Sequence, residues 1–87
     1  MKILKFYSPT CGPCKVVDNL LRQLNAEFTN INVAEDCYLP EITNVDITTY
    51  YQVQSVPTLI KIEDDGTEIK RLKGVTTIEN LKEFLMN

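Results

Sequence analysis

The feature that most constrains this chain is a pair of cysteines, Cys11 and Cys14, at the point where a strand pattern passes into a helix pattern. Residues 3–7 form a short apolar segment with an aromatic end, which predicts a buried strand followed by a turn over residues 8–10. After the cysteines, apolar residues recur at helical spacing, which predicts an amphipathic helix from about residue 12 to residue 26. A Cys-x-x-Cys motif in such a setting favours redox chemistry. The apolar positions are Val17, Leu20, Leu21, Leu24 and Phe28.

The rest of the chain alternates between strand and helix patterns. Asp64-Asp65-Gly66 predicts a hairpin turn, because glycine tolerates the positive φ that such turns require. Thr76-Thr77-Ile78-Glu79 predicts a capping box that opens a final helix. The expected elements are a strand over 28–34, a loop over 35–44, a short helix capped by Asp46 and running to about Gln52, strands over 59–62 and 67–72, and the final helix after a break at Gly74.

This β-α-β-α-β-β-α order predicts a single α/β domain over residues 1–87. Strands joined through a helix are expected to be parallel, and the closing hairpin adds antiparallel strands. The predicted architecture is therefore a mixed four-stranded sheet flanked by three helices.

Composition argues against several classes of function. The net charge is −3 and the nine lysines and arginines are scattered, whereas a nucleic-acid-binding surface needs a basic stripe. No segment approaches the roughly 20 apolar residues of a membrane helix, and Lys5 interrupts the first apolar stretch before it reaches signal-peptide length. We therefore expect a cytoplasmic protein without nucleic-acid or membrane partners. Three cysteines and no histidine predict neither a disulfide scaffold nor a metal site.

The two cysteines have different expected roles. A thiolate attacks a disulfide, so a redox site must lower the pKa of one thiol. Cys11 would lie at a helix N-terminus, where unpaired amides and the helix dipole stabilise an anion, and Lys15 adds positive charge. Cys11 is thus the expected nucleophile, and Cys14 would close the disulfide that releases the substrate. Gly12 lets a partner chain approach, and Pro13 suits a first helical turn. In the competing interpretation, the cysteines are core filler or a structural pair.

Val56-Pro57-Thr58 is the second candidate feature. Pro57 directly before a strand is tolerated because its missing donor falls at the strand start. With a cis Val56–Pro57 bond, the backbone of Val56 would face outward, where an extended substrate could pair with it. Cis bonds make up only about 5–6% of X-Pro bonds in folded proteins, so the local sequence by itself favours trans.

These segments together resemble the thioredoxin family over almost the whole chain. The matching parts are Phe6 through Lys15 with CGPCK, the turn at residues 55–58, and Gly74 with the helical segment 78–85. The chain lacks the extra N-terminal strand and helix of standard thioredoxins, as do small thioredoxins of some archaea and phages. The resemblance implies a thioredoxin-like fold and a cis Val56–Pro57 bond. It also implies a substrate groove formed by the CGPC segment, Thr10, Val56, Pro57, Thr58 and Gly74.

The resemblance further implies a protein-disulfide reductase. The Cys11–Cys14 disulfide would be its redox centre, with no bound cofactor, and the protein would be a monomer. Thioredoxin reductase would donate electrons, and disulfide-containing proteins such as ribonucleotide reductase would accept them. One alternative is a glutaredoxin reduced by glutathione; its Gly-Gly-acidic grip is absent, because Val75, Thr76 and Thr77 follow Gly74. Another is a binding module or subunit that uses the fold without redox chemistry.

The chain departs from the family around the cysteines. Thr10 and Tyr7 stand where thioredoxins carry tryptophans, which puts partner choice in question. Lys5 aligns with the family's buried Asp below the second cysteine, and Glu35 aligns with a family Lys. We hypothesise that Lys5 and Glu35 form a charge-reversed pair that handles the proton of Cys14. The alternative is that Lys5 extends its stem and reaches solvent.

Cys37 follows the second predicted strand, whose end should lie at the same sheet edge as Cys11. One interpretation makes it a third redox or regulatory thiol. The commoner role of such a residue is that of a small buried hydrophobe.

Overall fold

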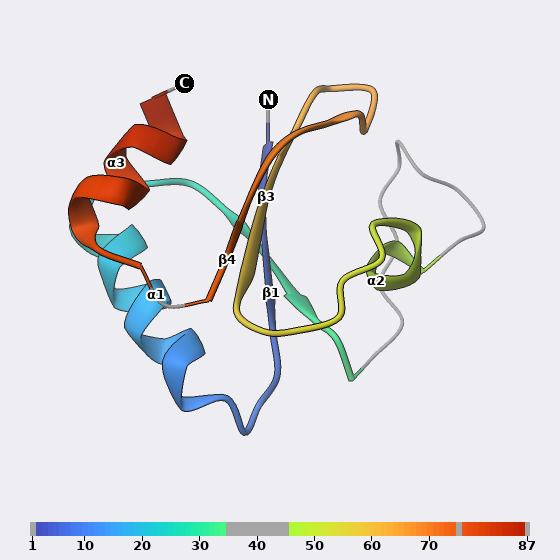
Figure 1. Cartoon of the computed structure of the whole chain (residues 1–87), viewed down its shortest axis with the longest axis horizontal. Coiled ribbons are helices and arrows are strands. Elements are labelled where there is room, and N and C mark those ends of the chain that lie inside the picture. Colours follow the sequence, from blue (N-terminus) through green and yellow to red (C-terminus); the bar gives the residue numbers. More distant parts are fainter. Residues whose placement is uncertain (1, 35–45, 75, 87) are drawn as a thin grey trace.

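The computed structural model describes residues 2–34, 46–74 and 76–86. Within them the order β-α-β-α-β-β-α confirms the predicted α/β fold, with a four-stranded sheet and three helices (Figure 1). The elements are β1 (Lys2–Tyr7), α1 (Gly12–Gln23), β2 (Thr29–Asn32), α2 (Ile47–Tyr50), β3 (Thr58–Ile62), β4 (Glu68–Lys73) and α3 (Ile78–Met86).

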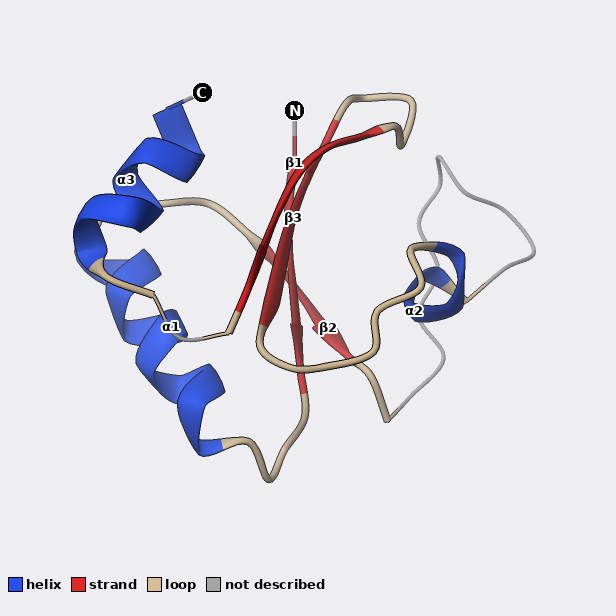
Figure 2. Ribbon diagram, viewed as in Figure 1, coloured by secondary structure: helices blue, strands red, loops and turns tan. Residues whose placement is uncertain are grey.

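The sheet is mixed, with strand order β2-β1-β3-β4 (Figure 2). β1 and β2 are parallel, as expected of strands joined through a helix, whereas β3 runs antiparallel to both β1 and β4. In the β1–β3 register Phe6 lies opposite Thr58. The start of β3 therefore lies beside the end of β1, where the chain turns toward the cysteines.

The helices cover both faces of the sheet, with α1 and α3 on one side and α2 on the other (Figure 2). Side chains alternate along β1, so Leu4 and Phe6 pack toward α2 while Ile3 packs toward α1. Each face buries its own apolar cluster. The α2 side holds Leu4, Phe6, Ile31, Ile47, Tyr51, Ile60 and Ile62, and the other side holds Val17, Leu21, Leu59, Leu81 and Phe84.

α1 is shorter than the predicted 12–26. It ends at Gln23, because Asn25 has a φ of 53°, a left-handed conformation that no α-helix continues. The amide of Ala26 then bonds back to the carbonyl of Leu21 at 3.0 Å. Asparagine tolerates this conformation better than most residues, which explains why the chain turns here.

β2 is also shorter than the predicted 28–34. It ends at Asn32, whose side-chain oxygen accepts a hydrogen bond from the amide of Ala34 at 2.9 Å. This local Asx-type bond replaces the next step of the strand. The limits of β3 and β4 differ from the predicted 59–62 and 67–72 by one residue at each shifted end, a difference that helix and strand assignment commonly shows.

One helix cap is confirmed and another is wrong by one residue. Asp46 caps α2, accepting a bond from the backbone amide three residues on at 3.2 Å, and α2 ends before Gln52, which has a φ of 54°. At α3 the cap is Thr77 rather than Thr76: its hydroxyl accepts from the amide of Asn80 at 3.2 Å. α3 therefore begins at Ile78, one residue later than the predicted capping box with Thr76 as its cap implies.

The two ends of the described chain lie on the same side of the molecule. β1 begins and α3 ends at one extremity of the molecule, and the connection from β1 to α1 lies at the opposite one (Figure 1). Within the described ranges, no helix combines the length and apolar character needed to cross a membrane.

Two adjacent valines of α1 provide a matched test of this packing. Val17 is 1% exposed and Val16 is 47% exposed. We expect Val17→Ala to lower the free energy of unfolding by about 2 kcal/mol, because two buried methyl groups are lost and a cavity remains. Val16→Ala should change it by less than about 0.5 kcal/mol. Urea unfolding of both variants measures the difference, and equal losses would contradict the packing described.

Candidate active site

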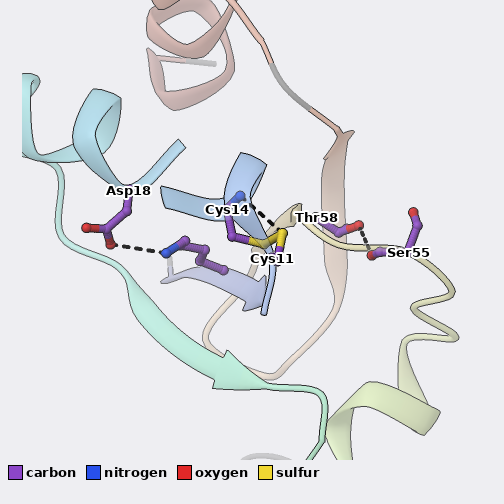
Figure 3. The surroundings of a disulfide bond; sticks show 6 residues. Cys11, Cys14, Asp18, Ser55 and Thr58 are labelled. Carbon is purple, nitrogen blue, oxygen red and sulfur yellow. Dashed lines mark hydrogen bonds and ion pairs between the residues drawn. A yellow bond between two sulfur atoms is a disulfide. The ribbon is translucent and has the colours of Figure 1, made fainter. Parts of the chain in front are cut away.

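Cys11 is the N-cap of α1, and its sulfur occupies the place of a capping side chain. Its backbone is extended, with φ −86° and ψ 105°, and its amide donates to the carbonyl of Ser8 at 3.1 Å. The Cys11 sulfur accepts a hydrogen bond from the amide of Cys14 at 3.1 Å (Figure 3). The sequence folds this way because the turn at Ser8–Cys11 connects β1 directly to the first helical turn. The amide of Cys14, in that first helical turn, is thus directed at the Cys11 sulfur.

Cys11 and Cys14 are joined in a disulfide, with their Cα atoms 5.3 Å apart. Cys14 is 3% exposed, whereas Cys11 is half-buried. Gly12 and Pro13 between them are exposed, and a Cβ placed on Gly12 would meet no atom within 4 Å. Cys11 is therefore the more accessible of the two cysteines, and the space beside Gly12 is open. Lys15 follows in the first turn and is exposed.

The proline turn lies beside the disulfide (Figure 3). The Val56–Pro57 bond is cis, as the family resemblance implied and against the trans bond favoured by the local sequence. Pro57 is buried and Val56 is half-buried. The Thr58 hydroxyl, also buried, donates to the carbonyl of Ser55 at 2.8 Å, which closes the turn.

Gly74 is joined to this turn by a backbone hydrogen bond. Its amide donates to the carbonyl of Pro57 at 2.8 Å, and its φ of +78° is one that glycine adopts readily. The structure thus brings together the proline turn and the glycine that the family resemblance assigns to one groove. Thr10 is exposed on the loop before Cys11.

A cleft of about 450 Å³ opens next to the disulfide, between β1 and α1. The residues that line the cleft include two lysines, one aspartate, one tyrosine and the two cysteines. Its walls include Lys5, Tyr7, Cys11, Cys14, Lys15 and Asp18. Tyr7 is half-buried there.

Lys5 is 5% exposed, so the prediction that it could reach solvent is wrong. Its ammonium group lies 3.1 Å from Asp18 Oδ1, and Arg22 Nε donates to Asp18 Oδ2 at 2.7 Å. The ammonium nitrogen also lies 5.3 Å from the centre of the Tyr7 ring. Desolvation explains the arrangement, because a buried cation requires a counter-charge. Glu35, the partner proposed from the sequence, lies outside the described residues, as does Cys37.

Asp18 remains charged despite being largely buried. Burial by itself would raise the pKa of its carboxyl, but hydrogen bonds and charges from Arg22 and Lys5 outweigh burial, and the pKa lies below its ordinary value. The carboxylate is therefore a fixed anion at neutral pH rather than a proton acceptor.

The sequence pattern places Asp18 on the polar face of the helix and does not reveal its contact with Lys5. A signal was available, because Asp18 lies four residues after Cys14 and so on the same side of the helix. A lysine inside a buried strand also calls for an acidic partner. In the part of the chain that the structure describes, no group of three or more His, Cys, Asp or Glu side chains could hold a metal ion.

Comparisons with known proteins agree on the family. The thioredoxin family model matches residues 1–87. A prophage-derived thioredoxin-like protein, YosR of Bacillus subtilis, is 34% identical over 74 residues, which cover 85% of this chain and 82% of YosR. Thioredoxin of Staphylococcus aureus is 32% identical over 85 residues, which cover 98% of this chain and 79% of the relative.

Solved structures show the same fold. A thioredoxin variant from Halobacterium salinarum superposes with a TM-score of 0.73 at 27% identity, covering 94% of this chain and 68% of that one. Oxidised mitochondrial thioredoxin 3 of Saccharomyces cerevisiae gives a TM-score of 0.72 at 26% identity, covering 97% and 74%. With the Cys11–Cys14 pair at the start of α1, these matches establish that the chain belongs to the thioredoxin family and is a thiol–disulfide oxidoreductase.

Proposed function

We propose that this protein reduces disulfides in other proteins, with Cys11 as nucleophile and Cys14 as resolving thiol. The observation that supports these roles is the asymmetry of the pair. Cys11 is half-buried at the helix N-terminus, and its sulfur accepts a hydrogen bond from the backbone amide of Cys14. Cys14 is buried one turn later. The reachable sulfur is thus the one whose anion the helix stabilises.

The reaction then proceeds in two exchanges. The Cys11 thiolate attacks one sulfur of the substrate disulfide, and the other substrate sulfur leaves as a thiolate that takes a proton from solvent. A mixed disulfide now joins Cys11 to the substrate. The thiolate of Cys14 attacks the Cys11 sulfur, the Cys11–Cys14 bond forms, and the second substrate sulfur leaves and is protonated. Two electrons pass from the protein to the substrate, and the protein is left oxidised.

Substrate binding is assigned to the surface around the reachable sulfur. Thr10 directly precedes Cys11 and is exposed, the turn with Val56 and Pro57 lies beside the disulfide (Figure 3), and Gly74 donates to the carbonyl of Pro57. An extended substrate segment would pair with the backbone of Val56. Because this recognition uses main-chain groups, it would accept many sequences around a substrate disulfide.

The proposed electron donor is thioredoxin reductase with NADPH, and the proposed acceptors are disulfide-containing proteins such as ribonucleotide reductase. We assign the protein to the cytoplasm, where a reducing poise keeps such a carrier supplied with electrons. No cofactor is needed, since the electrons reside in the cysteine pair itself. We also propose that the protein acts as a monomer.

Insulin reduction tests the function directly. With thioredoxin reductase and NADPH, we expect the protein to reduce insulin and consume NADPH, because the Cys11–Cys14 disulfide is regenerated and re-reduced in each cycle. A parallel assay with glutathione, glutathione reductase and NADPH should give much slower turnover. Faster turnover with glutathione would support the glutaredoxin alternative, and no turnover with either donor would contradict the proposal.

Alkylation of the reduced protein tests the assigned roles. We expect iodoacetamide at neutral pH to modify Cys11 at least about tenfold faster than Cys14, because Cys11 is accessible and its thiolate lies at a helix N-terminus. Peptide mapping by mass spectrometry resolves the two sites. Faster modification of Cys14 would reverse the roles.

Removal of the resolving thiol should trap the intermediate. In Cys14→Ser the mixed disulfide between Cys11 and a substrate protein has no intramolecular route to release, so a covalent complex should accumulate. Non-reducing electrophoresis detects the covalent complex, and dithiothreitol should separate its two proteins by reducing the mixed disulfide. Cys11→Ser is the matched control and should trap nothing. Equal trapping by both variants would contradict the assignment.

A further inference from the structure

Lys5 is an unusual residue for the interior of this domain. It belongs to the central strand β1 and pairs in register with the apolar Leu59 of β3, yet its ammonium group is inside the molecule. The same side chain lines the cleft that contains both cysteine sulfurs. A buried cation is costly to keep, and it acts strongly on neighbouring charges because little water screens it.

The partner of Lys5 is placed by the same helix that carries the cysteines. Asp18 lies four residues after Cys14 on α1, and its two oxygens are divided between Lys5 at 3.1 Å and Arg22 at 2.7 Å. Figure 3 shows the first of these two contacts. One carboxylate therefore faces two cations, which leaves a net positive charge in this cluster. Arg22 is 69% exposed and well screened by water, so the cation of this cluster that acts inside the cleft is Lys5.

The other groups facing Lys5 do not oppose this charge. From α1, Lys15 lines the same cleft and is also a cation. From β1 and β2, the lining groups are the phenol of Tyr7 and the amide of Asn30. Among the described residues that line the cleft, Asp18 is the sole acidic side chain, and it is already paired with Lys5 and Arg22.

We infer that Lys5 stabilises the thiolate of Cys14 in the resolving step, and that Asp18 is the residue that positions Lys5 for it. This inference rests on the proposed roles of the two cysteines. In the mixed disulfide, Cys14 loses its proton to solvent and its thiolate attacks the Cys11 sulfur. The Cys11–Cys14 bond forms while the bond from Cys11 to the substrate breaks, and the substrate sulfur leaves with the electron pair. The buried cation favours the first of these events, because Cys14 at 3% exposure has little water to stabilise its anion.

The pKa of Cys14 is the decisive measurement, taken in a Cys11→Ser background so that no second thiolate interferes. The Cβ chemical shift of Cys14 followed against pH gives the value and separates it from Cys37. We expect Lys5→Met to raise the Cys14 pKa by about one unit, because an attractive charge is removed. Asp18→Asn should lower it, because the amide oxygen of asparagine can still accept the hydrogen bond that positions Lys5 while the counter-charge is removed.

Control variants separate this effect from damage to the fold. Lys5→Arg keeps the charge and should leave the Cys14 pKa close to that of the parent. Lys82→Met removes one lysine from the exposed surface of α3 and should have no effect. If Lys5→Met fails to fold, Asp18→Asn and Lys5→Arg still decide the matter. A pKa unchanged by Asp18→Asn, or shifted by it in the same direction as by Lys5→Met, would overturn the inference.

A kinetic readout uses the protein with both cysteines. Release of substrate from the mixed disulfide, followed by rapid quenching, should be about threefold slower in Lys5→Met at neutral pH. The thiolate fraction falls about tenfold, while the more basic thiolate is about threefold more nucleophilic. The pKa arm requires no substrate. Insulin inactivity of the parent protein would therefore defeat the proposed function, whereas unchanged Cys14 pKa values with normal insulin reduction would defeat only the role of Lys5 and Asp18.

Discussion

The pairing of β1 with a strand on each side is the constraint on which the rest of this structure depends. Parallel pairing with β2 and antiparallel pairing with β3 fix both the position and the direction in which β1 ends. The chain can then enter α1 only by the turn at Ser8–Cys11, which leaves Cys11 as the helix cap. Because Thr58 lies opposite Phe6, the same pairing holds the cis-proline turn beside that cap. The hydrogen bonds of the sheet thus determine where the Cys11 sulfur and the backbone of the cis-proline turn lie.

The second determinant is the charge on the inner face of β1. Most positions that β1 turns toward α1 must be apolar to hold the helix, and Ile3 follows that rule. Lys5 does not, and it is tolerated because Asp18 arrives from α1 at hydrogen-bonding distance. Removing Asp18 would leave the buried charge of Lys5 uncompensated, whereas Asp18 without Lys5 would keep its contact with Arg22. The pair also joins the strand before the cysteines to the helix after them.

Much of the fold could be predicted from the sequence, because it follows from local patterns. The strand ending at Tyr7, the helix with Val17 and Leu21 inside, and the cap at Asp46 all arise from periodicity and capping chemistry within a few residues. Helix and strand ends were less predictable, since they depend on single backbone conformations such as the left-handed one at Asn25. The contact between Lys5 and Asp18 was missed because it joins two elements, and periodicity carries no information on which polar residues meet across them. The cis bond at Pro57 came from family resemblance, because its local sequence favours the trans form.

The placement of the chain ends has a practical consequence. β1 starts and α3 finishes on one side of the molecule, and the connection from β1 to α1 lies on the opposite side (Figure 1). A fluorescent protein, an affinity tag or a surface anchor joined at either of these ends would sit away from the cleft and leave it facing bulk solution. Immobilisation on an electrode through such an anchor would orient the Cys11–Cys14 pair outward. The proposed electron donor and a disulfide substrate could then still dock in turn.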